Sequence, residues 1–464
     1  MKKKLSFHVP HVYVIIATII LIVAALTWII PAGGFDTEEV EVNGVTREVA
    51  IPGTFKYLDE SNPTTPIDLL SSLHKGLVAG AEVTMLIFLV NGAFKMVIDS
   101  GTFDAFLGRM LKRYSKKAKI LIPIAFFIFA AGSSMFGMVN EYNGLIPVMM
   151  ALGIALGYDA LAGCAILILG RDIGWSAGTL NPYTVPVSQS IAGLPLYSAM
   201  GFRVVAFFIF GIIGIAYIFY YGQKIAKDPS KSLMNGVQLE MDFSKDSMET
   251  AVITKKHKII MTCVVVCIGI ILWGTLKAGW GNPELAGMFA FMGIFAGFVD
   301  GLKPSEIAEE FVKGAAGITM GALVVGLARA ILVIVQDAMI IDTIIYYAAS
   351  LLEGLPSVLA AQGMLLLTSI INFFIPSSTG AASVSIPILA PIGDFLGVSR
   401  QVTCLAFQFG DGFSNMLWPT AGIAVSLGIS GIPFDRWWRF FLPLFAILYV
   451  AQVIILSVAV LMGI

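Results

Sequence analysis

The stretch from Gly170 to Pro195 constrains the fold of this chain more than any other. It follows a continuous apolar run, so we expect it to lie inside a membrane, yet it contains Arg171, Asp172, Asn181 and several prolines and glycines. A regular helix is not expected to continue through such a composition. Backbone groups freed in hydrocarbon need partners, so a segment of this kind survives only when it is buried in protein or lines a polar cavity.

A second segment of the same kind runs from Gly410 to Pro433. Two broken membrane segments in corresponding positions of two halves indicate a transporter with its substrate site near the midplane. The composition agrees, because 57% of the 464 residues are hydrophobic and only 13% are charged, about half the charged fraction of a soluble domain. We therefore predict an all-α polytopic membrane protein that is a transporter and not an enzyme.

The apolar runs divide the chain into two halves and a connection. Each half is predicted to contain one re-entrant hairpin, because about 38 residues are too many for one crossing and too few for two, and one broken helix. The predicted boundaries are 1–222 for the first half, with its hairpin at about 120–157 and broken helix at about 161–193; 223–283 for the cytoplasmic linker and connecting helix; and 284–464 for the second half, with its hairpin at about 357–397 and broken helix at about 402–427.

Charge predicts the orientation of the chain. The lysines of the MKKK start precede an apolar run from Val12 to Ile30, which we interpret as a first membrane helix with a cytoplasmic N-terminus. Residues 31–66 are acidic, which places them outside. The segment at 103–119 is basic and amphipathic, which is typical of a helix on the cytoplasmic surface.

The two halves share a detailed pattern of spacings. The matched positions are Ser133-Ser134 with Ser377-Ser378, Pro147 with Pro387, Gly157 with Gly397, Gly170 with Gly410, Pro182 with Pro419, and GLP at 193–195 with GIP at 431–433. Counting helices puts the first hairpin on the cytoplasmic side and the second on the outside. The halves are therefore predicted to be inverted repeats, which indicates alternating access around a central site.

Two long motifs resemble a known family over essentially the whole chain. GTLNPYTVPVSQSIAGLP, followed by Phe202-Arg203, and MLWPTAG, preceded by FQFGDGFSN, are similar to the YfcC branch of the DcuC/ArcD carriers. The resemblance implies a multi-pass protein of the bacterial cytoplasmic (inner) membrane, a homodimer and an elevator-like moving domain. The family contains anaerobic dicarboxylate carriers and arginine/ornithine exchangers.

This chain departs from the family pattern at two places in the predicted site. Asn140-Glu141 stands where family members tend to have two adjacent glutamates, and Arg171-Asp172 stands where they tend to have small residues. A relative's substrate is therefore not transferred to this chain.

Hairpin tips and helix breaks supply the candidate substrate and ion contacts. Hydroxyls and half-helix amides suit anions, and carbonyls at half-helix ends suit sodium or ammonium groups. The alternative interpretation is that small polar residues only let helices approach closely. The candidates are Ser133, Ser134, Asn140, Glu141, Asn143, Arg171, Asp172, Gly178, Thr179, Asn181, Ser377, Ser378, Thr379, Asp411, Ser414, Asn415 and Thr420.

Carboxylates at membrane depth are costly unless they are paired or functional. Glu141 and Asp411 could bind a substrate amine or carry the coupling ion. For Glu141, the structural alternative is an ion pair with Arg171 or Arg329. Arg329 itself is interpreted as structural. Arg171 either pairs with Asp172 or clamps a dicarboxylate.

The resulting hypothesis is a secondary active transporter for a small amino acid or carboxylate metabolite, first of all a basic amino acid such as arginine or ornithine. A four-carbon dicarboxylate is the alternative. No Walker motif is present, so the driving force is predicted to be a sodium or proton gradient or substrate exchange.

The remaining predictions concern partners and rival classes. We expect lipid and a small molecule as partners, no nucleic acid, no resident cofactor and no metal site. An intramembrane aspartyl protease, suggested by GYD at 157–159 and FGD at 409–411, and a passive channel are the remote alternatives.

Overall fold

The computed structural model describes residues 12–42, 45–106, 109, 118–239, 252–352, 354–420 and 422–464. Six of the helices in these ranges, α3, α10, α12, α13, α17 and α21, are long and apolar enough to cross a membrane. A bent pair formed by α14 and α15 qualifies as a seventh span if it is counted as one. The protein is a multi-pass, mainly helical membrane protein, as the hydropathy pattern predicts.

The first half of the chain begins with helices and short strands that flank the acidic loop. Its elements are α1 (Val12–Leu26), β1 (Gly33–Gly34), β2 (Thr37–Val42), β3 (Val45–Ala50), β4 (Lys56–Tyr57), α2 (Pro66–Ala79), α3 (Ala81–Asp99), η1 (Ala118–Ile120), α5 (Leu121–Phe136), α6 (Asn140–Asn143), α7 (Ile146–Ala155), α8 (Ala160–Ser176), α9 (Val185–Ile191), α10 (Met200–Lys227) and η2 (Pro229–Lys231). Strands β1 and β4 pair antiparallel, as do β2 and β3.

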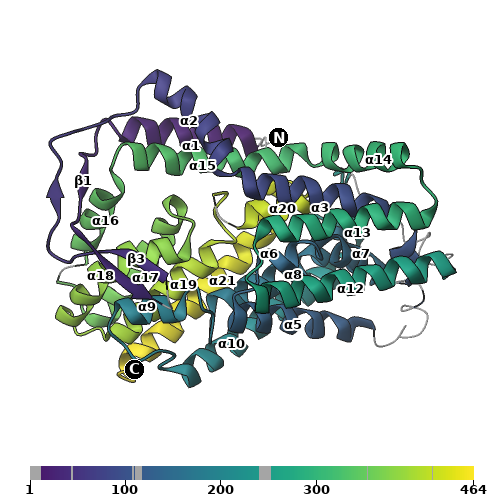
Figure 1. Ribbon diagram of the computed structural model, residues 1–464. Helices are drawn as coiled ribbons and strands as arrows, with labels where there is room; N and C mark the ends of the chain where they lie inside the picture. The colour runs from purple at the N-terminus through teal and green to yellow at the C-terminus, as the bar shows by residue number, and fades with distance from the viewer. Residues whose placement is uncertain are drawn as a thin grey trace, which may run out of the picture.

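The connecting helix and the second half contain helices and no strand in their described residues. Its elements are α12 (Lys255–Ala278), α13 (Asn282–Asp300), α14 (Pro304–Gly317), α15 (Thr319–Asp337), α16 (Ile341–Ser350), α17 (Ser357–Phe374), α18 (Ser378–Phe395), α19 (Arg400–Ser414), α20 (Ile423–Ser430) and α21 (Phe434–Leu461). Helices α5 and α7 lie toward one end of the molecule, and α17 and α18 lie toward the other (Figure 1).

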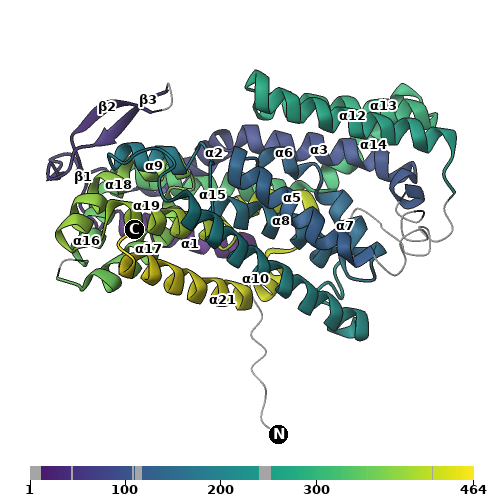
Figure 2. The ribbon, with the colours of Figure 1, turned by 90° about the horizontal axis from the view of Figure 1, so that it is seen from below.

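Several predicted elements need correction. The helix expected over Val12–Ile30 ends at Leu26, and its 15 residues are fewer than the roughly 20 that a crossing needs. The all-α prediction missed the four strands between 33 and 57, which form a small hairpin region at one corner of the molecule (Figure 2). Most of the basic segment at 103–119 and the linker residues 240–251 lie outside the described residues.

The position of the helix breaks is a further correction. Helix α8 continues through Gly170, Arg171 and Asp172 and ends at Ser176, and α19 likewise continues through Gly410 and Asp411 to Ser414. The charges do not interrupt α8, because Arg171 and Asp172 bond to each other and α8 itself contains no proline. Both helices end a few residues before a proline, Pro182 after α8 and Pro419 after α19.

Small residues set how closely the helices approach. A Cβ on Gly174 would lie 2.2 Å from the Ala130 carbonyl oxygen, so α8 packs directly on the α5 backbone. A Cβ on Gly412 would lie 2.4 Å from the Cα of Ser176, which brings the ends of α19 and α8 together. These contacts place both breaks side by side in the centre of the molecule.

Helix α15 is held against α2 in the same way. A Cβ on Gly76 would lie 2.5 Å from the Ala330 amide nitrogen, and the Cβ on Gly326 would lie 2.6 Å from Leu77. At the water-exposed end of this pair, Lys75 and Asp337 form an ion pair of 2.7 Å. The close packing fixes the face of α15 that carries Arg329.

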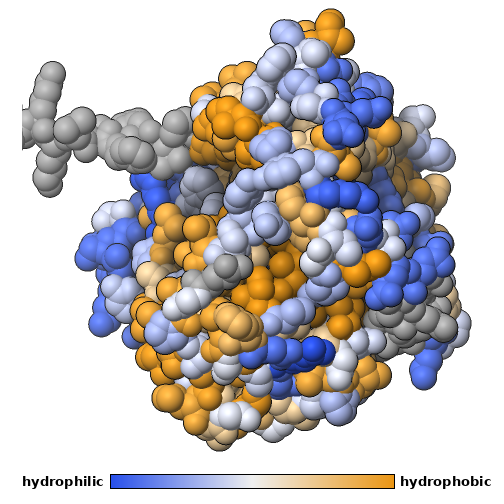
Figure 3. Space-filling model, turned by 90° about the vertical axis from the view of Figure 1, so that its left-hand side faces the viewer, coloured by the Kyte–Doolittle hydropathy of each residue, from blue (hydrophilic) through white to orange (hydrophobic). Residues whose placement is uncertain are grey.

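Large apolar side chains cover much of the outer surface. Trp273 is 61% exposed and Ile212 is also 61% exposed, although both lie in membrane-crossing helices. Such exposure is expected where lipid, and not water, surrounds the helix. The end of the molecule near α16 and α18 shows hydrophilic side chains around an apolar hollow (Figure 3).

Candidate functional site

The ends of both hairpins and both helix breaks surround one cavity of about 420 Å³. The residues come from five separate stretches of chain, which meet only in the folded protein. The lining residues are Gly137, Val139, Asn140, Glu141, Asp172, Trp175, Tyr183, Arg329, Pro376, Ser377, Ser378, Thr379, Asn415 and Gly422. The volume suits a small metabolite.

The first hairpin contributes the turn between α5 and α6. Gly137 ends α5 in the left-handed region with φ of 69°, and a Cβ there would lie 2.5 Å from the Tyr183 ring, so only glycine fits. After this turn Glu141 folds back, and its Oε2 accepts a hydrogen bond from the Val139 amide at 2.8 Å. Its carboxylate makes no ion pair with any described residue.

Helix α8 contributes a buried ion pair. Arg171 Nε and Nη2 donate to the two carboxylate oxygens of Asp172, each at 2.8 Å, in a bidentate arrangement. The remaining Nη1 donates to Asn143 Oδ1 at 2.8 Å and to Ser426 Oγ at 3.0 Å. All three nitrogens of the Arg171 guanidinium therefore bond inside the protein, and only Asp172 of this pair lines the cavity.

The second hairpin presents its hydroxyls where α18 begins. Ser377 caps α18, and its hydroxyl accepts from the Gly380 amide. Ser378 donates to the Asp411 carboxylate and accepts from Trp175 Nε1 at 3.3 Å. Ser378 thus links the second hairpin to both α19 and α8, while Thr379 faces the cavity beside it.

The break after α19 is held by Asn372 of α17. Its Nδ2 donates to the Asp411 carbonyl at 2.8 Å, to Ser414 Oγ at 2.7 Å and to Asn415 Oδ1 at 3.2 Å. Asn415 lines the cavity, whereas Ser414 is buried behind it. Asp411 is also buried, so it acts on the cavity through Ser378.

The other predicted site residues lie behind the cavity wall. Ser134 donates to the Ala177 carbonyl at 3.1 Å and bonds to Thr179, which ties the first hairpin to the break after α8. Asn181 Oδ1 accepts from the Tyr183 amide at 3.0 Å. Ser133, Asn143, Gly178 and Thr420 are not on the wall.

Sequence reasoning left seven wall residues out of the site: Gly137, Val139, Trp175, Tyr183, Arg329, Pro376 and Gly422. Trp175 and Tyr183 stack with ring centroids 6.0 Å apart. Arg329 lies on α15, far along the sequence from both breaks, and makes no ion pair or side-chain hydrogen bond with any residue the structure describes. An unpaired intramembrane arginine was the one available signal.

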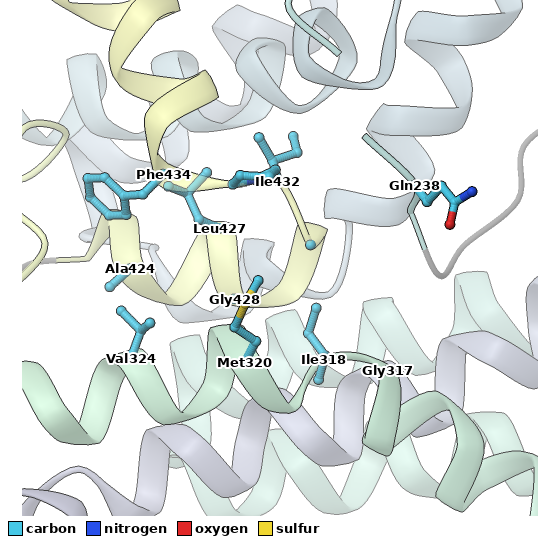
Figure 4. Close-up of a pocket in the computed structure, with 12 residues that line it drawn as sticks. Gln238, Gly317, Ile318, Met320, Val324, Ala424, Leu427, Gly428, Ile432 and Phe434 are labelled. Carbon is cyan, nitrogen blue, oxygen red and sulfur yellow. The ribbon is translucent and has the colours of Figure 1, made fainter. Parts of the chain in front are cut away.

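Two further cavities adjoin the site. One of about 440 Å³ is lined by Ile375 and Gly380, which flank the site residues of the second hairpin on either side. Another, of about 180 Å³, lies between α15 and α20, with Val324, Met320 and Ala424 among its mostly apolar side chains (Figure 4). The contact between α15 and α20 is therefore incompletely filled.

Comparison with known proteins relates this chain to transporters. The family model described as DcuC, C4-dicarboxylate anaerobic carrier, matches residues 9–461. The Escherichia coli K12 protein named "Putative basic amino acid antiporter YfcC" is 30% identical over 98% of this chain and 97% of its own. The Alcanivorax borkumensis YdaH transporter covers 98% of this chain and 99% of its own, at 16% identity and a TM-score of 0.44.

Proposed function

Because the chain belongs to the DcuC family of carriers, we propose that it is a secondary active transporter that exchanges small amino acids, first of all basic ones such as arginine and ornithine. The observation that carries the proposal is the cavity that both hairpins and both helix breaks share. In transporters with discontinuous helices, the substrate site lies where such breaks meet.

The charges on the cavity wall favour an amino acid. Glu141 offers a carboxylate without an ion-pair partner among the described residues, and Arg329 offers a guanidinium in the same state. Asp172 adds a second carboxylate that Arg171 already neutralises. An α-amino acid carries one carboxylate and one ammonium group, which matches Arg329 and Glu141 in sign. The name of the Escherichia coli relative points the same way.

A four-carbon dicarboxylate is the second candidate, and the description of the family favours it. Two carboxylates require two cationic contacts or equivalent amides. Arg329 supplies one, but Arg171 bonds to Asp172, Asn143 and Ser426 and does not line the cavity. This difference in available cations places the dicarboxylate second.

The proposed mechanism is alternating access by an elevator movement between inverted halves. The hairpins lie toward opposite ends of the molecule (Figure 1), which supports inversion. The incompletely filled, mostly apolar contact between α15 and α20 supports movement of the hairpins and breaks past α15. We further propose that the carrier is a homodimer in the inner membrane, with its N-terminus in the cytoplasm.

Hydrolytic activity is not part of the proposal. Asp159 begins α8, where its carboxylate accepts from the Ala162 amide, Tyr221 and Ser232. Asp411 lies near the end of α19 and accepts from Ser378. An aspartyl protease needs its two carboxyl groups to share one site, and these two have separate partners.

Counterflow into proteoliposomes tests the proposal. We expect uptake of radiolabelled arginine that internal ornithine stimulates and internal succinate does not, and that saturates with substrate. Uptake of fumarate stimulated by internal succinate would instead establish the dicarboxylate carrier. Uptake that needs no internal substrate, stays linear in concentration and occurs for both solutes would identify a channel and contradict the carrier.

A further inference from the structure

Arg203 is a buried cation that the proposed site does not use. It is the fourth residue of α10 and is 1% exposed. Its Nη1 donates to the Gly178 carbonyl at 3.5 Å, and its Nε and Nη2 have no partner within the described residues. No carboxylate pairs with it in those ranges. A charge at this depth without a counter-ion is costly and calls for a compensating field.

The end of α8 supplies that field. Helix C-termini carry a partial negative charge from unpaired carbonyls and favour cations. Three backbone carbonyls at this end accept hydrogen bonds from side chains. The Trp175 carbonyl accepts from Gln408 Nε2 at 2.7 Å, and the Ala177 carbonyl accepts from Ser134 Oγ at 3.1 Å. The Gly178 carbonyl accepts from Arg203 Nη1. In carriers with broken helices, carbonyls of this type coordinate the coupling sodium ion. Here protein donors occupy them.

The backbone carbonyls after α19 also accept hydrogen bonds from side chains, but the donors there are neutral. Trp437 Nε1 donates to the Met416 carbonyl at 2.9 Å, and Trp438 Nε1 donates to the Leu417 carbonyl at 2.9 Å. Trp437 is the fourth residue of α21, as Arg203 is of α10. The same helical position therefore serves both breaks, and the charged donor occurs at the first one.

We propose that Arg203 is a tethered cation that holds the end of α8 in the place where a coupling sodium ion would bind, so that exchange proceeds without sodium. The inference rests on the proposed exchange function. Arg203 is a positioning residue, because it donates to the Gly178 carbonyl of the break and lies off the cavity wall. The wild-type carrier then needs no sodium because its cation is covalently attached.

Transport by three variants tests the role of the charge. Arginine/ornithine exchange by the wild type is expected to be equal in sodium and choline buffers. Arg203→Ala is expected to lose about 10- to 100-fold in rate, the cost of a hydrogen bond to a charged group, and added guanidinium is expected to restore it. Arg203→Lys should retain partial activity, and Arg439→Ala, an exposed arginine, is the matched control.

Thermal unfolding of the purified full-length chain tests the cation site without substrate. Guanidinium and sodium are expected to raise the unfolding midpoint of Arg203→Ala and to leave the wild-type midpoint unchanged. A wild-type midpoint or exchange rate that rises with sodium would overturn the inference. This measurement uses the wild type alone, so it remains decisive even if the variant does not fold. A wild type that exchanges nothing contradicts the proposed function, while the unfolding data still decide the cation site.

Discussion

Glu141 is the wall carboxylate best placed to meet a substrate ammonium group. Its Oε2 accepts from the Val139 amide, and its other oxygen has no hydrogen-bond donor among the described side chains. Glu141→Gln keeps the size and removes the charge, so we expect transport of a basic amino acid to fall about 10- to 100-fold. Uptake kinetics in proteoliposomes would measure this, with the exposed Glu82→Gln as control. Normal transport by Glu141→Gln would remove Glu141 from the site.

Asp172 is expected to be needed for stability as well as for the shape of the cavity. Asp172→Asn would leave Arg171 buried without its counter-ion, which costs about 3–5 kcal/mol when a buried pair loses one partner. We expect a lowered thermal unfolding midpoint in detergent. Removing both charges together, as Arg171→Met with Asp172→Asn, should recover much of it. A stable Asp172→Asn that only loses transport would show a direct substrate contact instead.

The elements were predictable where local sequence determines them. Glycine and proline patterns predicted interruptions of the chain near the observed ends of α5, α8, α17 and α19, because these residues act on the backbone directly. The break itself was misplaced toward Arg171, because its bidentate bond with Asp172 depends on side-chain geometry. Arg329 was assigned a structural role because its approach to the cavity depends on how α15 packs on α2, which the local sequence does not show.

The contact between α15 and α20 offers a test of movement at the level of elements. Val324 and Ala424 face the same small cavity from the two helices. If α20 slides past α15 during transport, linking Val324→Cys to Ala424→Cys with a short bifunctional reagent should abolish exchange, and reduction or cleavage of the link should restore it. The native cysteines, Cys164, Cys263, Cys267 and Cys404, are replaced first.

A second cross-link, between α2 and α15, provides the control, because both helices belong to the part of the molecule that is proposed not to move. Lys75 and Asp337 join α2 to α15 at 2.7 Å, so Lys75→Cys with Asp337→Cys can be cross-linked without spanning the moving contact. Exchange should persist after this link forms. Equal inhibition by both links would contradict the elevator movement, and activity after both would show that α15 and α20 stay together.

The orientation of the whole molecule follows from its charge distribution. Residues 31–66 hold seven acidic and two basic residues, and the described part of this region forms short strands at one end of the molecule (Figure 1). The end of α10 holds Lys224 and Lys227, and η2 after it holds Lys231, which favours the cytoplasm. These two regions should therefore face opposite sides of the membrane.

Single cysteines at exposed positions can decide this orientation. Glu39 in β2 and Asn235 after η2 are both exposed. In a variant without native cysteines, Glu39→Cys should react with a membrane-impermeant maleimide in intact cells, whereas Asn235→Cys should react only after permeabilisation. The opposite pattern would reverse the topology, and with it the side from which each hairpin enters. Because the inverted arrangement assigns the first hairpin to the cytoplasmic side, that result would exchange the inner and outer gates of the proposed carrier.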